Sequence, residues 1–327
     1  MSVLFKFLYS QLFVTPPVPQ HDFSGETVII VGANIGLGLE AARHIARLKA
    51  GHLVLAVRTQ SKGETAKRDI VASTGISPDA VSVRIVDLSS NKSVIAFSHT
   101  IYAEFKKVDA LLLNASILPF TFATNEDGVE LGVATNVIGT FLLAILMLPL
   151  LRVSATIKPV HLSIVASEVH AFTTLPEKKH AHIFNALNVN SPDFERLQER
   201  YNVTKLMQVF IARELAQRVD CDRVIVNFLN PGLCHSNLTS TAKGWGSFVV
   251  ETLKYWIGRT TEVGSRTLVH ALSAGKESHG QYLSDCKVEP PAVFVTSDEG
   301  VKVQKRLWEE LTEILENVRP GILKNIA

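Results

Sequence analysis

The chain has 327 residues, of which 46% are hydrophobic and 20% are charged. This composition excludes a disordered chain, and the length is sufficient to bury a large core. The formal net charge of +2 argues against a nucleic-acid-binding protein, which would need a strongly basic face. Cys221, Cys234 and Cys286 form no close pair, so we expect no disulfide framework, no metal site and a reducing, cytoplasmic location.

Two apolar stretches bear on membrane contact. Residues 3–14 are interrupted by Lys6, Ser10 and Gln11 and are too short to span a bilayer. We expect residues 1–22 to form an arm packed on a domain of residues 23–327, with weak membrane association of residues 1–14 as the alternative. Residues 137–151 contain Gly139 and Pro149 and also fall short of a span, so we expect a buried helix there.

Apolar runs rich in Val, Ile and Leu alternate with helical patterns along the chain. They lie at 27–31, 53–57, 81–86, 110–113, 160–165, 224–229 and, for a short last one, 281–283. This alternation is typical of βαβ units on a parallel sheet, and runs that are apolar throughout predict helices on both faces. We therefore expect an α/β fold, a Rossmann-type doubly wound parallel sheet of about seven strands. A small helical substrate cap is expected at about residues 236–282.

The first two strands are separated by a predicted helix. Leu39, Ala42 and Ile45 share one face of this helix, and Gly51 is expected to close it at a C-cap position. Before the helix, the first strand runs directly into a glycine-rich turn, GANIGLG at residues 32–38. Glycines let backbone N–H groups approach a pyrophosphate, and the helix N-terminus favours its negative charge. The position of the turn favours dinucleotide binding over a merely tight connection.

The end of the second strand distinguishes two nucleotides. An acidic residue there would bind the ribose 2′-hydroxyl of NAD(H), whereas an arginine accepts the 2′-phosphate of NADP(H). At this place the chain has Arg58, whose guanidinium is planar and permanently charged. No acidic residue lies between Arg58 and Glu64. An ordinary solvated arginine is the alternative, but the pattern favours NADP(H).

Tyr201 and Lys205 are four residues apart in a helical stretch and so lie on one helix face. A free tyrosine has a pKa of about 10. A neighbouring ammonium would lower the tyrosine pKa toward the working range of an acid–base group. Ser167 follows the fifth strand, at the edge where a doubly wound sheet binds ligands, and its hydroxyl could donate to a carbonyl oxygen. Taken alone, the tyrosine–lysine pair would more simply be a helix-surface pair with no function.

Further motifs follow the other strands. They are Asp87-Leu88 after the third strand, Asn114-Ala115-Ser116 after the fourth, Thr135-Asn136-Val137-Ile138-Gly139 and Asn230-Pro231-Gly232. In this order, the motifs resemble those of the short-chain dehydrogenase/reductase family. The retinol-dehydrogenase-like branch is most similar, especially its fungal members associated with secondary metabolism. The resemblance covers nearly the whole chain.

The resemblance implies a catalytic tetrad of Asn136, Ser167, Tyr201 and Lys205. Tyr201 would exchange a proton with the substrate oxygen, which Ser167 would hold. Lys205 would bind the nicotinamide ribose and lower the tyrosine pKa, and Asn136 would support a water that relays protons through Lys205. The implied cofactor is NADPH/NADP, and no metal is implied. The implied cofactor contacts are Gly32, Asn34, Ile35, Gly36, Leu37, Arg58, Asp87, Leu88, Asn114, Ala115, Tyr201, Lys205, Pro231, Gly232 and Ser236.

The chain departs from the family pattern at four positions. Val31 replaces the usual threonine before the first glycine, and Ile35 replaces the polar or basic residue before the second. Ser116 stands where the family has glycine, and Ala166 stands where it has the first serine of a pair. None of the four belongs to the tetrad, so they bear on cofactor affinity more than on the chemistry.

The expected activity is NADPH-dependent reduction of a ketone or aldehyde, or the reverse alcohol oxidation, on a lipophilic, polyketide-like small molecule. The segment after Gly232 supports this substrate because it is rich in apolar and aromatic side chains, Trp245 among them. Two alternatives stay open: a non-redox enzyme of the same fold (dehydratase, epimerase or cyclase), and a nucleotide-sensing regulator, against which the intact tetrad argues. The resemblance also suggests a homodimer through the helices that carry Asn136 and Tyr201, although residues 141–150 could equally be core.

Overall fold

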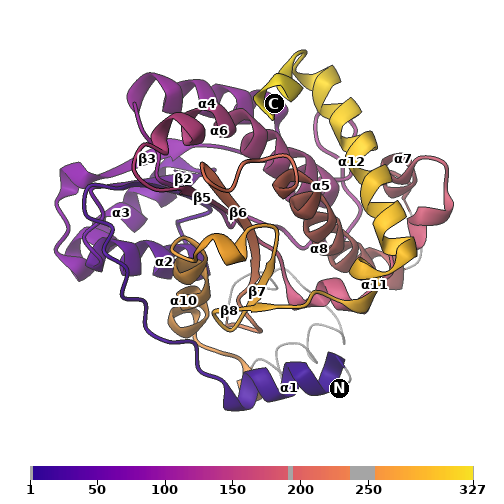
Figure 1. Cartoon of the computed structure of the whole chain (residues 1–327), viewed down its shortest axis with the longest axis horizontal. Helices are drawn as coiled ribbons and strands as arrows, with labels where there is room; N and C mark the ends of the chain where they lie inside the picture. Colours follow the sequence, from indigo (N-terminus) through magenta and orange to yellow (C-terminus); the bar gives the residue numbers. More distant parts are fainter. Residues whose placement is uncertain (1–2, 191–193, 236–254, 327) are drawn as a thin grey trace.

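One sheet runs through the centre of the molecule and draws its strands from both halves of the chain (Figure 1). The computed structural model describes residues 3–190, 194–235 and 255–326. Within these residues, eight strands lie in the order β3-β2-β1-β4-β5-β6-β7-β8. Their bounds are β1 Thr27–Val31, β2 His52–Val57, β3 Val81–Ile85, β4 Ala110–Leu113, β5 Val160–Val165, β6 Val224–Asn230, β7 Tyr282–Ser284 and β8 Lys287–Glu289.

The pairing of the strands is parallel from β3 to β7, and β8 alone runs antiparallel to its neighbour. The strand order reverses between β1 and β4, where the chain passes from one half of the sheet to the other. In a doubly wound sheet, the crevice at the carboxyl ends of the strands beside this switch point is where ligands bind. The expected Rossmann-type sheet is therefore confirmed.

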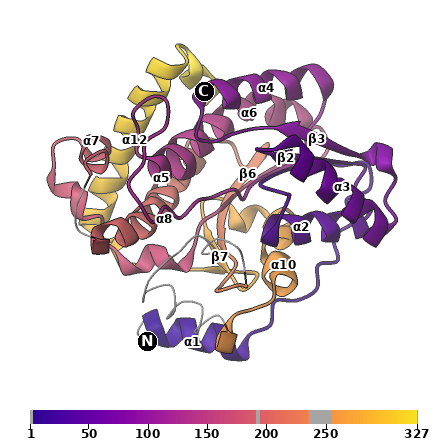
Figure 2. The same ribbon diagram turned by 180° about the vertical axis from the view of Figure 1, so that it is seen from behind.

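Helices cover both faces of the sheet, as Figures 1 and 2 show from opposite sides. One face carries α2 Gly36–Arg47, α3 Gln60–Thr74 and α10 Thr261–Ala271, and the other carries α4 Asn91–Glu104, α6 Thr140–Ser154 and α8 Phe194–Ala216. A further long helix, α12 Asp298–Val318, packs outside α8. The short helices are α1 Val3–Phe13, α5 Leu131–Val133, α7 Ile183–Leu187 and α11 Val293–Thr296. The 3-10 and π turns are η1 Pro78–Ala80, η2 Ala134–Gly139, η3 Glu168–Phe172, η4 Pro176–Lys179, η6 Lys276–Ser278 and η7 Ile322–Asn325.

The core consists of two apolar layers, one on each side of the sheet. On β1, Val28 and Ile30 face the layer under α2, α3 and α10, whereas Ile29 and Val31 face the layer under α4, α6 and α8. All four side chains are buried, which explains why the strand sequences are apolar throughout rather than alternating. Residues 236–254 of the expected cap lie outside the described residues. The described part of the cap includes α10, which packs against α2 and contributes Leu268 to the core.

Two details of the fold differ from the sequence-based expectations. The sheet has an eighth strand, β8, which is three residues long, exposed and two-thirds charged, and so lacks the apolar signal of the others. The helix α2 ends at Arg47 instead of being closed by Gly51, and Lys49 takes the left-handed conformation (φ 66°). Gly51 is needed for a close approach instead, because a Cβ there would lie 2.7 Å from the Cα of Gly25.

The apolar run at residues 137–151 is a core helix of this fold. Length and composition would allow the helical stretch Leu131–Ser154 to cross a membrane, but 94% of its most hydrophobic window is buried inside the structure. The C-terminal turn helps to cover α6, because Arg152 donates to the carbonyl oxygens of Asn325 (2.7 Å) and Ile326 (2.6 Å). Of the two readings left open for residues 141–150, the structure supports the core.

The N-terminal arm is a helix, α1, that lies at the edge of the molecule beside β7 and β8 (Figure 1). Gln11 is buried and donates from Nε2 to the carbonyl oxygens of Leu233 and Ile257, both at 3.0 Å. Its Oε1 accepts from the Leu233 amide at 3.1 Å. Arg259 donates to the carbonyl oxygens of Ser10 (2.9 Å) and Val14 (3.1 Å). These contacts hold α1 against the rest of the chain, while the division into an arm of residues 1–22 and a domain of residues 23–327 stays a prediction.

Candidate active site

The glycine-rich turn has the backbone that a pyrophosphate requires. Gly32 and Gly36 take positive φ angles of 82° and 59°, and a Cβ on Gly32 would lie 3.0 Å from Ala115. The helix α2 begins at Gly36, and its N-cap, Ile35, makes no side-chain capping hydrogen bond. The first N–H groups of α2 therefore have no side-chain cap and suit the oxygens of a bound phosphate. Asn34, Ile35 and Leu37 lie in the same turn, and Ile35 is exposed.

Asn114 braces this turn from the neighbouring strand. It follows β4, and its Nδ2 donates to the carbonyl oxygens of Gly32 at 3.1 Å and Val31 at 3.3 Å. A Cβ on Gly38 would come within 2.6 Å of the same Nδ2 atom, so Gly38 is needed for this close packing. The amide of Asn114 thus holds the backbone next to Val31, the position where the family's usual threonine is missing.

Arg58 and Asp87 lie at the carboxyl ends of the two neighbouring strands. Arg58 directly follows β2 and is exposed. Asp87 accepts from the backbone N–H and the hydroxyl of Ser89, at 2.9 and 2.7 Å. The next residue, Leu88, is buried, and its carbonyl oxygen would be only 1.9 Å from a Cβ on Gly139. The β3 loop is therefore held against the helical segment that contains Asn136.

Asn136 is fully buried within the π-helical turn η2. Its Oδ1 accepts from the N–H of Ile117 and its Nδ2 donates to the carbonyl oxygen of the same residue, both at 2.9 Å. The Nδ2 atom also donates to the Thr204 hydroxyl at 3.0 Å. The side chain thus joins the loop after β4 to α8. A single-turn π-bulge is often found at functional sites, and here it turns the Asn136 side chain into the core of the site.

Ser167 and Tyr201 lie together, with Ser167 at the end of β5 and Tyr201 on α8. Hydrogen bonding by the Ser167 side chain lowers the pKa of Tyr201. Burial acts more strongly in the opposite direction, so the pKa of Tyr201 is raised above its usual value. The net shift is therefore opposite to the lowering of the tyrosine pKa that was expected from Lys205. The Lys205 ammonium lies 5.6 Å from the centroid of the tyrosine ring.

Lys205 is buried, and its ammonium has three protein acceptors. They are the Ser116 hydroxyl at 2.7 Å, the Val165 carbonyl oxygen at 2.8 Å and Oε1 of Gln208 at 2.9 Å. Among the residues that the structure describes, no carboxylate pairs with this lysine. Burial therefore lowers the pKa of Lys205 to about 7, so that the charged and neutral forms are both populated at neutral pH.

Three further residues support the site, and the sequence analysis assigned no role to them. Ser116 and Gln208 contact Lys205 as described. His170 is buried, its Nδ1 lies 2.7 Å from the Ser167 carbonyl oxygen, and its Nε2 accepts from the Ala292 N–H at 3.0 Å. These contacts require a neutral ring with the proton on Nδ1. Burial lowers the pKa of His170, which is consistent with this neutral form. Ser116 is far in sequence from Lys205, so no local pattern could have identified it, whereas Gln208 and His170 each lie three residues from Lys205 and Ser167.

The loop after β6 lies beside the segment that follows Ser167. Asn230 accepts through Oδ1 from the backbone N–H groups of Gly232 (3.0 Å) and Glu168 (3.1 Å), which ties this loop to the segment after Ser167. The carbonyl oxygen of Pro231 accepts from Arg259 at 3.4 Å. Gly232 has a φ of 80°, and a Cβ there would lie 2.5 Å from Oε1 of Gln11 on α1. Ser236 and Trp245 lie outside the described residues.

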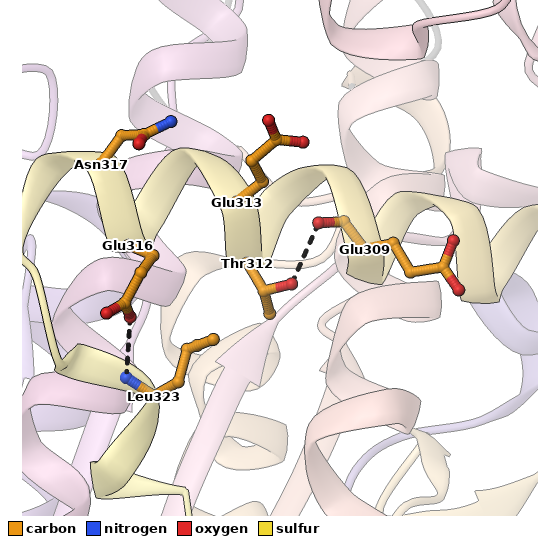
Figure 3. A pocket seen from close by; sticks show the side chains of 6 residues that line it. All are labelled: Glu309, Thr312, Glu313, Glu316, Asn317 and Leu323. Atoms are coloured by element: carbon orange, nitrogen blue, oxygen red, sulfur yellow. Dashed lines mark hydrogen bonds between the residues drawn. The ribbon is translucent and has the colours of Figure 1, made fainter.

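A surface hollow of the molecule lies away from these residues, between α12 and the C-terminal turn η7 (Figure 3). Its lining residues are Glu309, Thr312, Glu313, Glu316, Asn317 and Leu323. Two of the polar groups serve local structure, because the Thr312 hydroxyl donates to the Glu309 carbonyl oxygen and Glu316 accepts from the Leu323 N–H. The hollow therefore results from the packing of the C-terminal turn on α12.

Known proteins resemble this chain over most of its length. Residues 26–158 match the family model described as short chain dehydrogenase. The short chain dehydrogenase/reductase dmxR8 of Cryptosporiopsis sp. (strain 8999) is 41% identical, covering 98% of this chain and 99% of that protein. The short-chain dehydrogenase anuD of Penicillium roqueforti (strain FM164) is 44% identical, covering 98% and 85% respectively.

Solved structures share the fold at lower identity. The 3-ketoacyl-(acyl-carrier-protein) reductase from Brucella melitensis, complexed with NADH, has a TM-score of 0.59 and 21% identity, covering 80% of this chain and 97% of that one. A short chain dehydrogenase from Shigella flexneri, complexed with NADP, has a TM-score of 0.57 and 20% identity, covering 82% and 100%. With the fungal relatives above 40% identity over nearly the whole chain, this protein belongs to the short-chain dehydrogenase/reductase family.

Proposed function

We propose that this protein is an NADPH-dependent reductase of a ketone or aldehyde on a lipophilic small molecule. The observation that carries the proposal is that Ser167 and Lys205 both lie beside Tyr201: the Ser167 side chain acts on the pKa of Tyr201, and the Lys205 ammonium lies 5.6 Å from the centroid of the tyrosine ring. The Tyr201 and Ser167 hydroxyls could both reach one carbonyl oxygen. The cofactor supplies the hydride that reduces the carbonyl carbon. Ser167 stabilises the developing alkoxide by a hydrogen bond, and Tyr201 gives it a proton.

The protonation of Tyr201 supports reduction over the reverse oxidation. A carbonyl reductase needs Tyr201 as an acid, protonated before the reaction. Burial raises the pKa of Tyr201, so its hydroxyl keeps the proton at neutral pH. The oxidation of an alcohol would instead need the phenolate as a base, and burial makes this form costly.

The residues that would hold the cofactor lie along the carboxyl ends of the strands. In our proposal, Gly32, Asn34, Ile35, Gly36 and Leu37 bind the pyrophosphate through the uncapped start of α2. Arg58 pairs with the 2′-phosphate of NADPH. The remaining contacts are Asp87 and Leu88 at the adenine, Asn114 and Ala115 at the adjoining ribose, Tyr201 and Lys205 at the nicotinamide ribose, and Pro231, Gly232 and Ser236 beside the nicotinamide. The structural neighbours complexed with NADH and NADP support a nicotinamide cofactor of either kind.

An apolar substrate is supported by the segment that follows Gly232. In its described part, Tyr255 and Trp256 are exposed aromatic residues that pack edge to face, with ring centroids 5.4 Å apart. Side chains of this kind suit a ring system or a long chain rather than a small anion. We also propose a cytoplasmic location, and a homodimer in which α6 stays part of the core.

The test of the proposal is the replacement of Tyr201 by phenylalanine. Wild-type protein should oxidise NADPH, followed at 340 nm, with at least one member of a panel of lipophilic ketones and aldehydes. Tyr201→Phe should lower turnover at least 100-fold while leaving the affinity for NADPH within about twofold, because a general acid contributes about 10²–10⁴-fold. Tyr9→Phe, at a tyrosine exposed on α1, is the matched control. Product formation without net NADPH consumption would contradict the proposal and indicate the non-redox alternative.

A further inference from the structure

The proton that Tyr201 gives to the substrate must be replaced from solvent, and the structure closes the route expected for it. The resemblance implies that Asn136 supports a water that relays protons through Lys205. In this chain, Nε2 of Gln208 donates to the carbonyl oxygen of Asn136 at 2.6 Å, and Oε1 of Gln208 accepts from Lys205 at 2.9 Å. The buried amide of Gln208 therefore spans the gap between Asn136 and Lys205 directly.

An amide and a water differ in what they do with a proton. A water molecule donates and accepts through the same oxygen, so it passes a proton by exchanging one bond for another. The amide of Gln208 has a fixed donor end and a fixed acceptor end. It fixes the position of Lys205 relative to Asn136, but it has no proton that leaves readily at neutral pH. Gln208 is thus a positioning residue, and it blocks the route over Asn136.

The Ser116 hydroxyl offers another route for protons to Lys205. Ser116 is half-buried in the loop after β4, and its Oγ accepts from the Lys205 ammonium at 2.7 Å. A serine hydroxyl accepts and donates through one oxygen, as a water does. The family has glycine at this position, so the hydroxyl is a feature of this chain's own sequence.

We propose that the Ser116 hydroxyl is the proton inlet of this active site. The inference rests on the proposed reductase function. In each turnover, the O–H bond of Tyr201 breaks as its proton joins the alkoxide, and a proton from Lys205, whose nitrogen lies 5.6 Å from the centroid of the tyrosine ring, restores that bond. The Ser116 hydroxyl then gives its proton to the neutral amine of Lys205 and takes one from a solvent water. The net result is one proton moved from solvent to product, with no change in the oxidation state of any residue.

The variants Ser116→Ala and Ser116→Thr test the proposal. Ser116→Ala removes the hydroxyl and leaves a methyl group in its place, whereas Ser116→Thr keeps the hydroxyl. We expect Ser116→Ala to lower kcat at least tenfold and to raise the solvent deuterium isotope effect on kcat, with KM for NADPH within about threefold of wild type. Ser116→Thr should restore both kinetic values to within about threefold. Ser82→Ala, at a half-buried serine on the edge strand β3, controls for the loss of any hydroxyl.

A second readout does not depend on turnover. In the cofactor-free protein, NMR titration of labelled lysine should give a lower pKa for Lys205 in Ser116→Ala than in wild type, because the ammonium loses an acceptor. Ser116→Thr should restore that pKa. Unchanged kcat and isotope effect in Ser116→Ala would overturn the proton-inlet role while leaving the reductase function intact. A wild-type protein that reduces no carbonyl would instead overturn the proposed function, even if the Lys205 pKa responded as expected.

Discussion

At the scale of single residues, Arg58 should determine the choice between the two nicotinamide cofactors. It is exposed at the end of β2, next to the start of α3, and no acidic residue lies between it and Glu64. We expect NADPH to bind at least tenfold tighter than NADH, which is about 1.4 kcal/mol and within the reach of one charge-assisted hydrogen bond. Arg58→Ala should bring the two dissociation constants, measured by fluorescence titration, to within about threefold of each other.

The control for this prediction is Arg68→Ala, at an arginine exposed on the same helix, α3. That variant should keep the wild-type preference, because it lies two turns further along and its guanidinium donates to Thr65. Equal affinities for the two cofactors in wild type would contradict the role of Arg58.

Residue by residue, the candidate site shows what a local pattern reveals. The spacing of Tyr201 and Lys205 places them on one face of α8 regardless of the rest of the fold, and Ser167 follows a strand that its sequence marks clearly. The partners of Lys205 are different, because only Gln208 lies near it on α8, whereas Ser116 and Val165 come from the loop after β4 and from β5. Only the folded arrangement of β4, β5 and α8 decides which acceptors meet a buried ammonium.

At the scale of elements, α1 and the loop after β6 form one unit. Gln11 makes three hydrogen bonds to the backbone of Leu233 and Ile257, and it is buried. Gln11→Ala would leave these buried groups without partners, at a cost of about 1–3 kcal/mol. We expect a lower free energy of unfolding and faster hydrogen exchange at the Leu233 amide.

Leu12→Ala is the matched control, because Leu12 is the next residue of α1 and its side chain is 53% exposed. Its free energy of unfolding should stay within about 0.5 kcal/mol of wild type. If Gln11→Ala exchanged the Leu233 amide at the wild-type rate, α1 would not support the loop after β6.

Element boundaries show why a pattern of apolar residues is not enough. The strands with buried runs were located to within a residue or two, because their burial on both faces requires Val, Ile and Leu. The hairpin strand β8 carries no such run and was missed. The glycine after α2 was misplaced as a cap because its role is tertiary, a close contact with the backbone at Gly25. A local rule cannot distinguish these two uses of a glycine.

At the scale of the whole molecule, buried and half-buried histidines make stability depend on pH. Burial lowers the pKa values of His44, His52, His161, His170 and His270 below the usual 6.5. Their neutral forms are therefore favoured in the folded state, and the stability that they contribute is present above the unfolded pKa. As pH falls below 6.5, these histidines bind protons in the unfolded chain but stay neutral in the folded chain. The free energy of unfolding therefore falls.

Glu168 acts in the opposite direction, over an overlapping range of pH. Burial and the nearby charge of Asp285 raise its pKa from 4.5 to about 7, so the folded state favours the protonated carboxyl. The resulting stability is present below pH 4.5 and is lost as pH rises through about 7. Glu168→Gln keeps an oxygen that accepts from Asn230 and cannot ionise. Relative to wild type, we expect this variant to gain about 1–2 kcal/mol between pH 5 and pH 8, after allowing for the partial exposure of the carboxyl.

Urea unfolding of both proteins at pH 5, 6, 7 and 8 measures this difference. In wild type the histidines and Glu168 oppose each other between pH 4.5 and 6.5, so the free energy of unfolding rises less with pH than the histidines alone would make it rise. In Glu168→Gln the opposing contribution is gone, so the rise should be steeper and should continue to about pH 7. Glu309→Gln, at a carboxylate exposed on α12, should differ from wild type by the same amount at every pH. A difference between Glu168→Gln and wild type that stayed constant with pH would show that Glu168 ionises normally in the folded state.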